Sequence, residues 1–571
     1  MKKKTTYDII LFSILGVLAF LPILQEHFRL MSLKPLNGVV VEEEKPECSK
    51  GSYVSGHYQK QMEAYLGQHF GFREPVIRIY NQYLWNFYRK TYARDVAVGK
   101  KEWLYYQQSV SDYYGHELLR WHPDVESAKR DFDQEVKYLN WARTILYEND
   151  VELMVFMAPE KAFLYPEFLP NDVHDTTTFN ACDYFVDRLD ESGFPYIEMT
   201  RWFQKMKDTV DYPLIPQVGA HWIFTSVYAV DSLSRLMGEL KGVALPKIKI
   251  GEAYEVRQQD HDYDNDLEQL LNLSFALRHQ YGYCPRCEVG VEQDSTLVKP
   301  KVLFVGNSFF WSMAHFVPMK ELFDEVEFWY YFSTIYDGDD LQPRMSVAEA
   351  DVLEKLLHFD YVVWFTTGNQ MNKGTSGFAN ALVLNLCVSK KRIDETREYL
   401  TDSLALAALA HGDDTTGERQ SFWNKANDLI HNHPDRYFVE LASDSMPSFR
   451  NPRIREIMII NEIKRDSVWM ANLSGCQTVI QNTTLEQVLL MEAHNVIEGR
   501  PLMRDMPNPE QKRDLFLSLV EDMQNQIILK PDLMRQIEEK AKKNGKPVEK
   551  QLEADARWII NDKIKRGVIQ L

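Results

Sequence analysis

Apolar positions follow two different patterns along the chain, and the change between them divides it. From residue 126 to residue 384, short runs of mainly apolar residues are separated by stretches in which apolar residues recur every three or four positions. Strand-like runs that alternate with helices predict an α/β fold with a mainly parallel sheet covered by helices on both faces. The expected strands are Val151–Ala158, Tyr196–Met199, Lys301–Gly306, Val326–Tyr331 and Tyr361–Phe365.

From residue 385 the strand-like runs fade and helical spacing dominates, which predicts a helical accessory domain over residues 385–571. Segments 461–498 and 525–562 resemble each other faintly, with a period of about 64 residues. Two copies are fewer than the three or more that a solenoid needs. A duplicated helical hairpin is therefore expected, with no chemistry attached to it.

The N-terminus carries three lysines followed by the uncharged apolar run Ile9–Leu24. About 20 mainly apolar residues suffice to span a bilayer, and flanking lysines favour the cytoplasmic side. The run is longer than a usual signal-peptide core, and no small-x-small cleavage site follows it. We expect residues 1–29 to be an uncleaved anchor with the rest of the chain outside; a cleaved signal peptide is the alternative. Residues 30–125 are read as a linker and helical lead-in.

The net charge of −18 disfavours a nucleic-acid partner, because phosphate binding needs a concentrated positive surface. Six cysteines in 571 residues are not a disulfide framework. Only Cys284 and Cys287 are closely spaced, in a loop-like stretch where a local disulfide, half of a zinc site or a structural role stay open. The chain has no histidine-rich ligand spacing and no glycine-rich phosphate loop, so we expect neither a metal nor a cofactor.

Two segments carry residues suited to acyl transfer. Ser308 directly follows the strand Lys301–Gly306 and precedes a helix, a position that exposes the hydroxyl at the carboxyl edge of a sheet beside free backbone N–H groups. His221 stands at the entrance of another helix, and histidine is the usual base for a serine nucleophile. From spacing alone, Ser308 could equally cap its helix and His221 could be structural.

Three further segments precede these two residues, and the five together follow one order along residues 1–370. After the apolar N-terminus come an aromatic-rich segment, a segment around Gly99-Lys100 and a segment around Pro159-Glu160-Lys161. The His-Trp pair and the Gly-x-Ser-Phe turn follow. Their sequences are FGFRE (70–74), VAVGKKEWLYY (96–106) and MAPEKAFLYPEFLP (157–170).

This order of segments resembles the alginate O-acetyltransferase family, the AlgX and AlgJ type with an SGNH-hydrolase-like domain. The resemblance implies that Ser308 is the nucleophile and His221 its base. In that family an Asp precedes the histidine by two positions and another precedes the serine. Here Gly219 and Asn307 stand in those places. Another acid, for which Asp211 is the candidate, could serve His221; otherwise the pair works as a weaker dyad or the site is inactive.

SGNH enzymes also place an Asn side chain in the oxyanion hole. Asn369, which follows the last expected strand, is the candidate by position, and an ordinary polar loop residue is the alternative. The resemblance implies a membrane-anchored O-acetyltransferase, or an acetylesterase, that acts on an exported polysaccharide from the periplasmic side of the inner membrane. A multi-span membrane acyltransferase would supply the acetyl group. The other hypothesis is a catalytically impaired protein that binds polysaccharide or assembles an export machine.

Overall fold

The computed structural model describes most of the chain in two compact units. The described residues are 2–38, 42–171, 179–254, 264–277, 280–338, 340–410, 418–479, 483–505, 509–566 and 568–569. The first unit comprises residues 1–136, 154–344 and 363–376, and the second comprises residues 137–153, 345–362 and 377–571. These ranges interleave along the chain, whereas the domain boundaries predicted from sequence follow chain order.

The main sheet has seven strands in the order β10-β9-β8-β7-β11-β3-β4. Strands β7 and β8 are parallel, as are β3 and β4, whereas β9 runs antiparallel to β8. The strand bounds are β3 Glu152–Ala158, β4 Tyr196–Glu198, β7 Lys301–Gly306, β8 Glu325–Tyr330, β9 Thr334–Asp337, β10 Pro343–Ser346 and β11 Tyr361–Thr367. The predicted α/β fold is therefore confirmed, and each of the five predicted strands coincides with one of these.

Four strands outside the prediction form two antiparallel pairs, β1 (Val96–Val98) with β2 (Leu104–Tyr106) and β5 (Ile248–Tyr254) with β6 (Arg286–Val291). Strand β10, at one edge of the main sheet, and its neighbour β9 were also not predicted. All six are short or largely polar, because a strand at an edge or in a hairpin need not bury both faces. A run of apolar residues therefore predicts only those strands that are buried on both faces.

The centre of the sheet is closely packed. Every residue of β3 and of β11 is buried, and the rings of Phe156 and Phe365 stack with centroids 5.2 Å apart. At the end of β7, a Cβ on Gly306 would lie 1.8 Å from the carbonyl oxygen of Phe365. Only glycine fits there, so this contact fixes where β7 ends and where the following turn begins.

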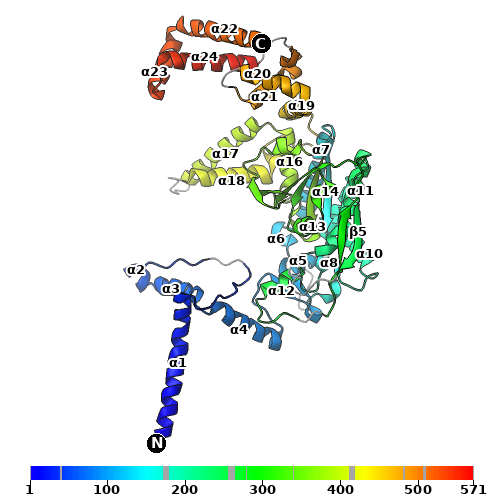
Figure 1. The fold of residues 1–571 in the computed structure, drawn as a ribbon, viewed down its shortest axis with the longest axis vertical. Helices are drawn as coiled ribbons and strands as arrows, with labels where there is room; N and C mark the ends of the chain where they lie inside the picture. The colour runs from blue at the N-terminus through cyan, green and yellow to red at the C-terminus, as the bar shows by residue number, and fades with distance from the viewer. Residues whose placement is uncertain are drawn as a thin grey trace. The chain divides into compact units, whose positions relative to one another are not determined.

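Helices surround these strands and connect them (Figure 1). In the first unit they are α1 Lys2–Phe28, α2 Lys50–Val54, α3 His57–Gln68, α4 Arg73–Tyr88, α5 Gln107–Tyr113, α6 Leu118–Trp121, α8 Lys161–Leu164, α9 Ala181–Ser192, α10 Met199–Met206, α11 Ser226–Lys241, α12 Asp266–Leu270, α13 Phe309–Phe316 and α14 Met319–Leu322, with the 3₁₀ turn η5 Gly368–Lys373. The long helix α7, Val125–Tyr147, contributes residues to both units.

Within α1, the segment Ile9–Phe28 has a mean hydropathy of 2.2 over 20 residues, long and apolar enough to cross a membrane. A signal sequence meets the same criteria of length and composition. Among the described residues this is the one helix that meets them.

The second unit is mainly helical. Its helices are α15 Val352–Leu356, α16 Phe378–Cys387, α17 Lys390–Ala410, α18 Arg419–Asn432, α19 Arg453–Arg465, α20 Ser467–Val479, α21 Leu485–Glu498, α22 Pro509–Ile528, α23 Pro531–Asn544 and α24 Val548–Lys565. The last six form two successive triplets, α19-α20-α21 and α22-α23-α24, in which each helix contacts the other two.

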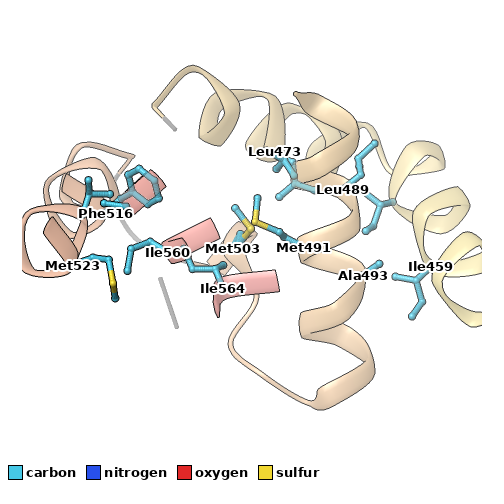
Figure 2. Close-up of a cluster of buried hydrophobic side chains, with 14 of the residues drawn as sticks. Ile459, Leu473, Leu489, Met491, Ala493, Met503, Phe516, Met523, Ile560 and Ile564 are labelled. Atoms are coloured by element: carbon cyan, nitrogen blue, oxygen red, sulfur yellow. The ribbon is translucent and has the colours of Figure 1, made fainter. Parts of the chain in front are cut away.

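The faint sequence repeat coincides with these triplets. Segment 461–498 covers the end of α19 with α20 and α21, and segment 525–562 covers the end of α22 with α23 and most of α24. Each copy is therefore a pair of helices, preceded by the end of the third helix of its triplet. Both contribute to one buried cluster, part of which is drawn in Figure 2, including Leu473, Leu489, Phe516 and Ile560.

Candidate active site

Ser308 lies where the chain leaves β7 and enters α13. Its backbone is already helical (φ −63°, ψ −16°), and its side chain makes no capping hydrogen bond. Asn307 turns the chain instead, because its Oδ1 accepts a hydrogen bond from the backbone N–H of Phe309 at 3.1 Å. The hydroxyl of Ser308 is thus available for another partner, at the carboxyl edge of the sheet where active sites of α/β folds form.

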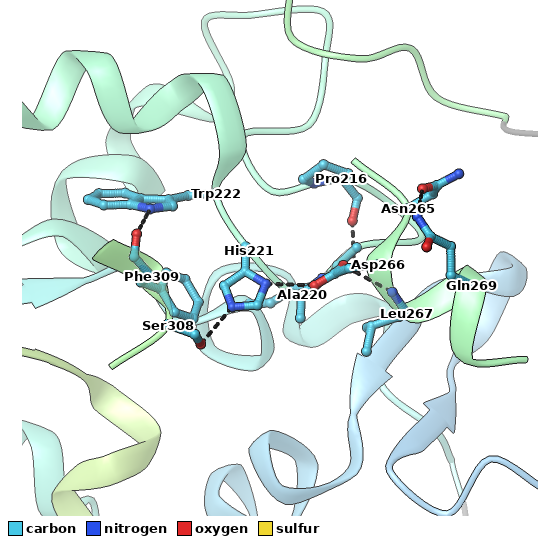
Figure 3. Close-up of polar contacts among 12 residues, drawn as sticks. Pro216, Ala220, His221, Trp222, Asn265, Asp266, Leu267, Gln269, Ser308 and Phe309 are labelled. Carbon is cyan, nitrogen blue, oxygen red and sulfur yellow. Dashed lines mark hydrogen bonds and ion pairs between the residues drawn. The ribbon is translucent and has the colours of Figure 1, made fainter. Parts of the chain in front are cut away.

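That partner is His221. Its Nε2 lies 2.8 Å from Ser308 Oγ, and its Nδ1 lies 2.6 Å from Asp266 Oδ2 (Figure 3). The next residue, Trp222, fixes the two segments against each other, since its Nε1–H donates to the carbonyl oxygen of Phe309 at 3.0 Å. With Nδ1–H donating to Asp266, Nε2 is left to accept the Ser308 proton, as a general base must.

The acid is not the one expected from sequence. Asp211 is solvent-exposed, whereas Asp266, 45 residues after His221, bonds the imidazole. Its other oxygen, Oδ1, accepts hydrogen bonds from the backbone N–H groups of Ala220 at 2.8 Å and Leu267 at 3.0 Å. Burial raises the pKa of Asp266, but the neighbouring His221 and these hydrogen bonds outweigh it and hold that pKa below its ordinary value. Asp266 is therefore an ionised carboxylate at neutral pH.

Gly219 explains why the acid can come from elsewhere. A Cβ on this glycine would lie 2.6 Å from the carbonyl oxygen of Asp264 and 3.0 Å from Asp266 Oδ1. The segment that carries Asp266 therefore occupies the space into which a side chain at position 219 would project. A side chain at position 219 and the Asp266 carboxylate would occupy the same space, so the glycine at 219 is what allows the acid to come from position 266. From sequence, Asp266 is one acid among several in residues 260–268, with nothing to connect it to His221.

Residues 96–321 match the family model described as the SGNH hydrolase-like domain of the acetyltransferase AlgX. The resemblance inferred from the sequence is confirmed over this region. No curated protein sequence matched the chain.

Solved structures with detectable similarity include three bacterial proteins. The O-acetyltransferase domain of Pseudomonas putida AlgJ is 11% identical, over 48% of this chain and 92% of its own, with a TM-score of 0.31. Pseudomonas aeruginosa AlgX is 14% identical, over 51% of this chain and 67% of its own, with a TM-score of 0.31. Bacillus cereus PatB1 is 10% identical, over 49% of this chain and 98% of its own, with a TM-score of 0.30.

Asp266, His221 and Ser308 all line one pocket of about 410 Å³. Asn369, on η5, lines this pocket together with Ser308. Its Oδ1 accepts a hydrogen bond from Thr367 Oγ1 at 2.5 Å, and its Nδ2 donates to Ser109 Oγ at 3.3 Å. The Nδ2 bond is long enough to be exchanged for a better acceptor. Asn369 is thus placed where an oxyanion donor could act, and that role stays a prediction.

A buried lysine holds the histidine segment of the AlgX-like domain in place. Lys161 is 2% exposed, and its Nζ lies 2.6–2.9 Å from the carbonyl oxygens of Leu104, Pro216, Gln217 and Gly219. Burial lowers the pKa of Lys161 well below its ordinary value, whereas the nearby carboxylates of Asp266 and Glu160 raise it. Four carbonyl oxygens can only accept hydrogen bonds, which favours the ammonium form with its three N–H donors.

The residue before the lysine is a second buried carboxyl group at the pocket. Glu160 is 3% exposed and lines the pocket beside His221. Burial raises its pKa from 4.5 to about 7, against opposing hydrogen bonds from Ser109 and from the backbone N–H groups of Ala162 and Lys161. The charge of Glu160 is accordingly expected to change near neutral pH.

In the described part of the chain, no group of three or more His, Cys, Asp or Glu side chains could hold a metal ion. Cys284 and Cys287 lie at the start of β6 as free thiols. Burial raises the pKa of the Cys284 thiol to about 12, which makes it a poor nucleophile and a poor metal ligand.

Replacing Gly219 by Ala should destabilise the protein, because the new methyl group would meet the Asp264 carbonyl and the Asp266 carboxylate. Overpacking of this kind costs about 1–3 kcal/mol. Chemical denaturation of the Gly219→Ala variant would measure the loss of unfolding free energy. Gly282→Ala is the matched control, since a Cβ at that exposed glycine meets nothing within 4 Å. Equal stability of the two variants would contradict the close approach at position 219.

Glu160→Gln should change how stability depends on pH. Between pH 4.5 and about 7, folded Glu160 holds a proton that the unfolded chain has released, so the folded state loses stability as pH rises through this window. A glutamine removes that loss, which amounts to at most about 3 kcal/mol. The unfolding midpoint should therefore fall less from pH 5 to pH 8 in the variant than in the wild type. An identical fall in both proteins would show that Glu160 has an ordinary pKa.

Proposed function

We propose that this protein is a membrane-anchored, extracytoplasmic O-acetyltransferase of the serine type that acts on an exported polysaccharide. The hydrogen-bonded series Asp266–His221–Ser308 at the pocket is the observation that supports this most directly. The match of residues 96–321 to the AlgX acetyltransferase domain supports the reaction class. The apolar segment Ile9–Phe28 supports anchoring, with most of the chain on the periplasmic side of an inner membrane that it crosses once.

In the first half-reaction, His221 Nε2 takes the proton from Ser308 Oγ as this oxygen attacks the carbonyl carbon of a bound acetyl group. Asp266 holds the Nδ1–H tautomer and stabilises the imidazolium that forms. The bond from the acetyl carbon to its donor then breaks, and the donor leaves with the proton from His221. The product is acetyl-Ser308. The donor would be an acetyl group delivered by a multi-span membrane acyltransferase.

The negative charge that forms on the acetyl oxygen needs hydrogen-bond donors in place beforehand. The backbone N–H of Ser308, at the start of α13, and the Nδ2 of Asn369 are the proposed pair. Removing one such donor from an oxyanion hole typically costs about 10²–10³ in rate. Asn307, which is buried and bonded to Thr367 and Gln370, holds the turn on which this arrangement depends.

In the second half-reaction, a sugar hydroxyl enters the same pocket, His221 Nε2 takes its proton, and the resulting alkoxide attacks the acetyl carbon. Ser308 leaves and recovers the proton from His221. Water in place of the sugar would give an acetylesterase by the same steps. The difference between the two activities therefore lies in what the pocket admits after acetyl-Ser308 has formed.

The second candidate function is an impaired enzyme that binds polysaccharide or assembles an export machine. It was motivated by the missing carboxylate at position 219. With Asp266 bonded to His221 Nδ1, that motive no longer applies. The binding role is left without a specific observation in its favour among the described residues.

Ser308→Ala should abolish hydrolysis of a chromogenic acetate ester by the full-length protein, lowering turnover by at least about 10³-fold, because no other group in the series can form the ester. The same variant should lose labelling by a serine-reactive fluorophosphonate. Labelling that persists in Ser308→Ala would refute the assignment of the nucleophile. If the wild-type protein turned over the ester no faster than Ser308→Ala does, the binding function would be favoured.

Asp266→Asn should lower turnover by about 10²–10⁴-fold while leaving the fold intact, because the amide favours the wrong imidazole tautomer. Asp211→Asn is the matched control and should retain full turnover, since Asp211 is exposed. Both variants should show unchanged circular dichroism. If Asp211→Asn lost activity and Asp266→Asn kept it, the acid predicted from sequence would be the correct one.

A further inference from the structure

The helix α4 exposes a row of apolar side chains along one face. Val76, Ile79, Tyr80, Tyr83 and Phe87 are each between 47% and 72% exposed. Their spacing of three, four, seven and eleven residues from Val76 places them on one side of a helix, within an arc of about 100°. Scattered exposed apolar residues need no explanation, but an aligned row of five does.

The opposite face of α4 is fixed to the rest of the first unit. Arg78 donates hydrogen bonds to the carbonyl oxygens of Lys34 and Pro35, and Asn81 Nδ2 donates to that of Leu271 at 2.9 Å. Trp85 is 3% exposed and packs in one cluster with Leu267 and Leu271, next to Asp266. The helix cannot turn its apolar row inward without giving up these contacts, so the row is presented to a partner.

The start of α4 lies against the outer end of the membrane-spanning segment. A Cβ on Gly71, two residues before the helix, would lie 2.1 Å from the carbonyl oxygen of Pro22 and 2.6 Å from the backbone nitrogen of Glu26. His69 Nδ1 lies 3.1 Å from Glu26 Oε1. Pro22 and Glu26 belong to the last turns of the apolar segment Ile9–Phe28. The apolar row therefore begins where a membrane-spanning α1 leaves the hydrocarbon.

The charge around α4 is opposite in sign to that of the whole chain. Residues 73–94 contain five basic residues and one acidic residue, whereas the chain has a net charge of −18. Lys90 and Arg94, just after the helix, are exposed. Tyrosine and other aromatic side chains collect at membrane–water interfaces, and basic residues beside them attract anionic headgroups.

We propose that α4 lies on the outer surface of the bilayer, with its apolar row among the lipid headgroups and its basic flank against anionic phospholipid. This inference rests on the extracytoplasmic anchoring proposed above. Because the inner face of α4 holds the segment that carries Asp266, the helix keeps the pocket within roughly a helix diameter or two, about 10–25 Å, of the membrane.

The test uses the full-length protein in vesicles of phosphatidylcholine and phosphatidylglycerol. Phe87 is replaced by the photoreactive amino acid p-benzoyl-phenylalanine, and Tyr399 in α17 is replaced in the same way as the control. Both side chains are aromatic and 72% exposed. Replacement of Phe12, in the apolar segment of α1, is the positive control for lipid capture. After irradiation, lipid adducts are quantified by mass spectrometry.

We expect lipid adducts at position 87 to exceed those at position 399 several-fold, and to decrease when phosphatidylglycerol is omitted. Equal yields at the two positions, with adducts present at position 12, would overturn the proposal. So would cross-linking of position 87 in cells to a protein or a polysaccharide in place of lipid. Resistance of the wild-type chain to alkaline extraction reports on anchoring separately, and turnover of the acetate ester reports on the catalytic function.

Discussion

The four hydrogen bonds of one buried ammonium group hold the candidate site together. Lys161 opens α8, three residues after the end of β3, and its ammonium group joins β2 to the segment that leads to His221. The carbonyl oxygens of Pro216, Gln217 and Gly219 belong to the irregular segment before His221, and that of Leu104 belongs to β2. Buried backbone polar groups need hydrogen-bond partners. The Lys161 ammonium group supplies donors to all four and so helps to hold the irregular segment in the interior of the fold.

This arrangement has a cost that the neighbouring carboxylates offset. A buried ammonium is strongly unfavourable unless it is paired and hydrogen-bonded. Asp266 supplies the compensating negative charge, and Glu160 adds to it above about pH 7, since both carboxylates raise the pKa of the lysine. The carboxylate that orients His221 therefore also helps to hold the charge on Lys161 beneath the same loop. Asp266 and Lys161 each stabilise the charged form of the other, so a substitution of either residue is expected to affect both the candidate site and the loop that Lys161 holds.

Residues of this site that have a local sequence signature can be predicted from the sequence. A residue that joins the site only through the folding of the chain cannot. A buried strand followed by a serine and a helix has a local signature, as does a histidine at a helix entrance, and the structure brings Ser308 and His221 into contact. The acid has no such signature. Asp266 reaches His221 only because an excursion of about 45 residues returns to the same edge of the sheet, and because Gly219 leaves room for it. Asp211 is nearer in sequence, but proximity along the chain is no guide to proximity in space. The same distinction applies to the strands, since the buried strands β3, β7 and β11 are marked by apolar runs, whereas the short β9 and the edge strand β10 are not.

The relation between α4 and the pocket bears on how an acetyl group would reach Ser308. In the proposed reaction, an acetyl group delivered from the membrane and a polysaccharide from outside would meet at one serine, and hydrolysis would compete while acetyl-Ser308 is exposed to water. A helix that lies on the bilayer and supports the Asp266 segment on its inner face would place the pocket close to the source of the acetyl group. Proximity of this kind raises the effective concentration of the donor without any new contact in the pocket. The Asp266 segment, which departs from the family pattern, is then also the segment through which the site is tied to the membrane, because the Asn81 and Trp85 contacts of α4 are made to its residues Leu267 and Leu271.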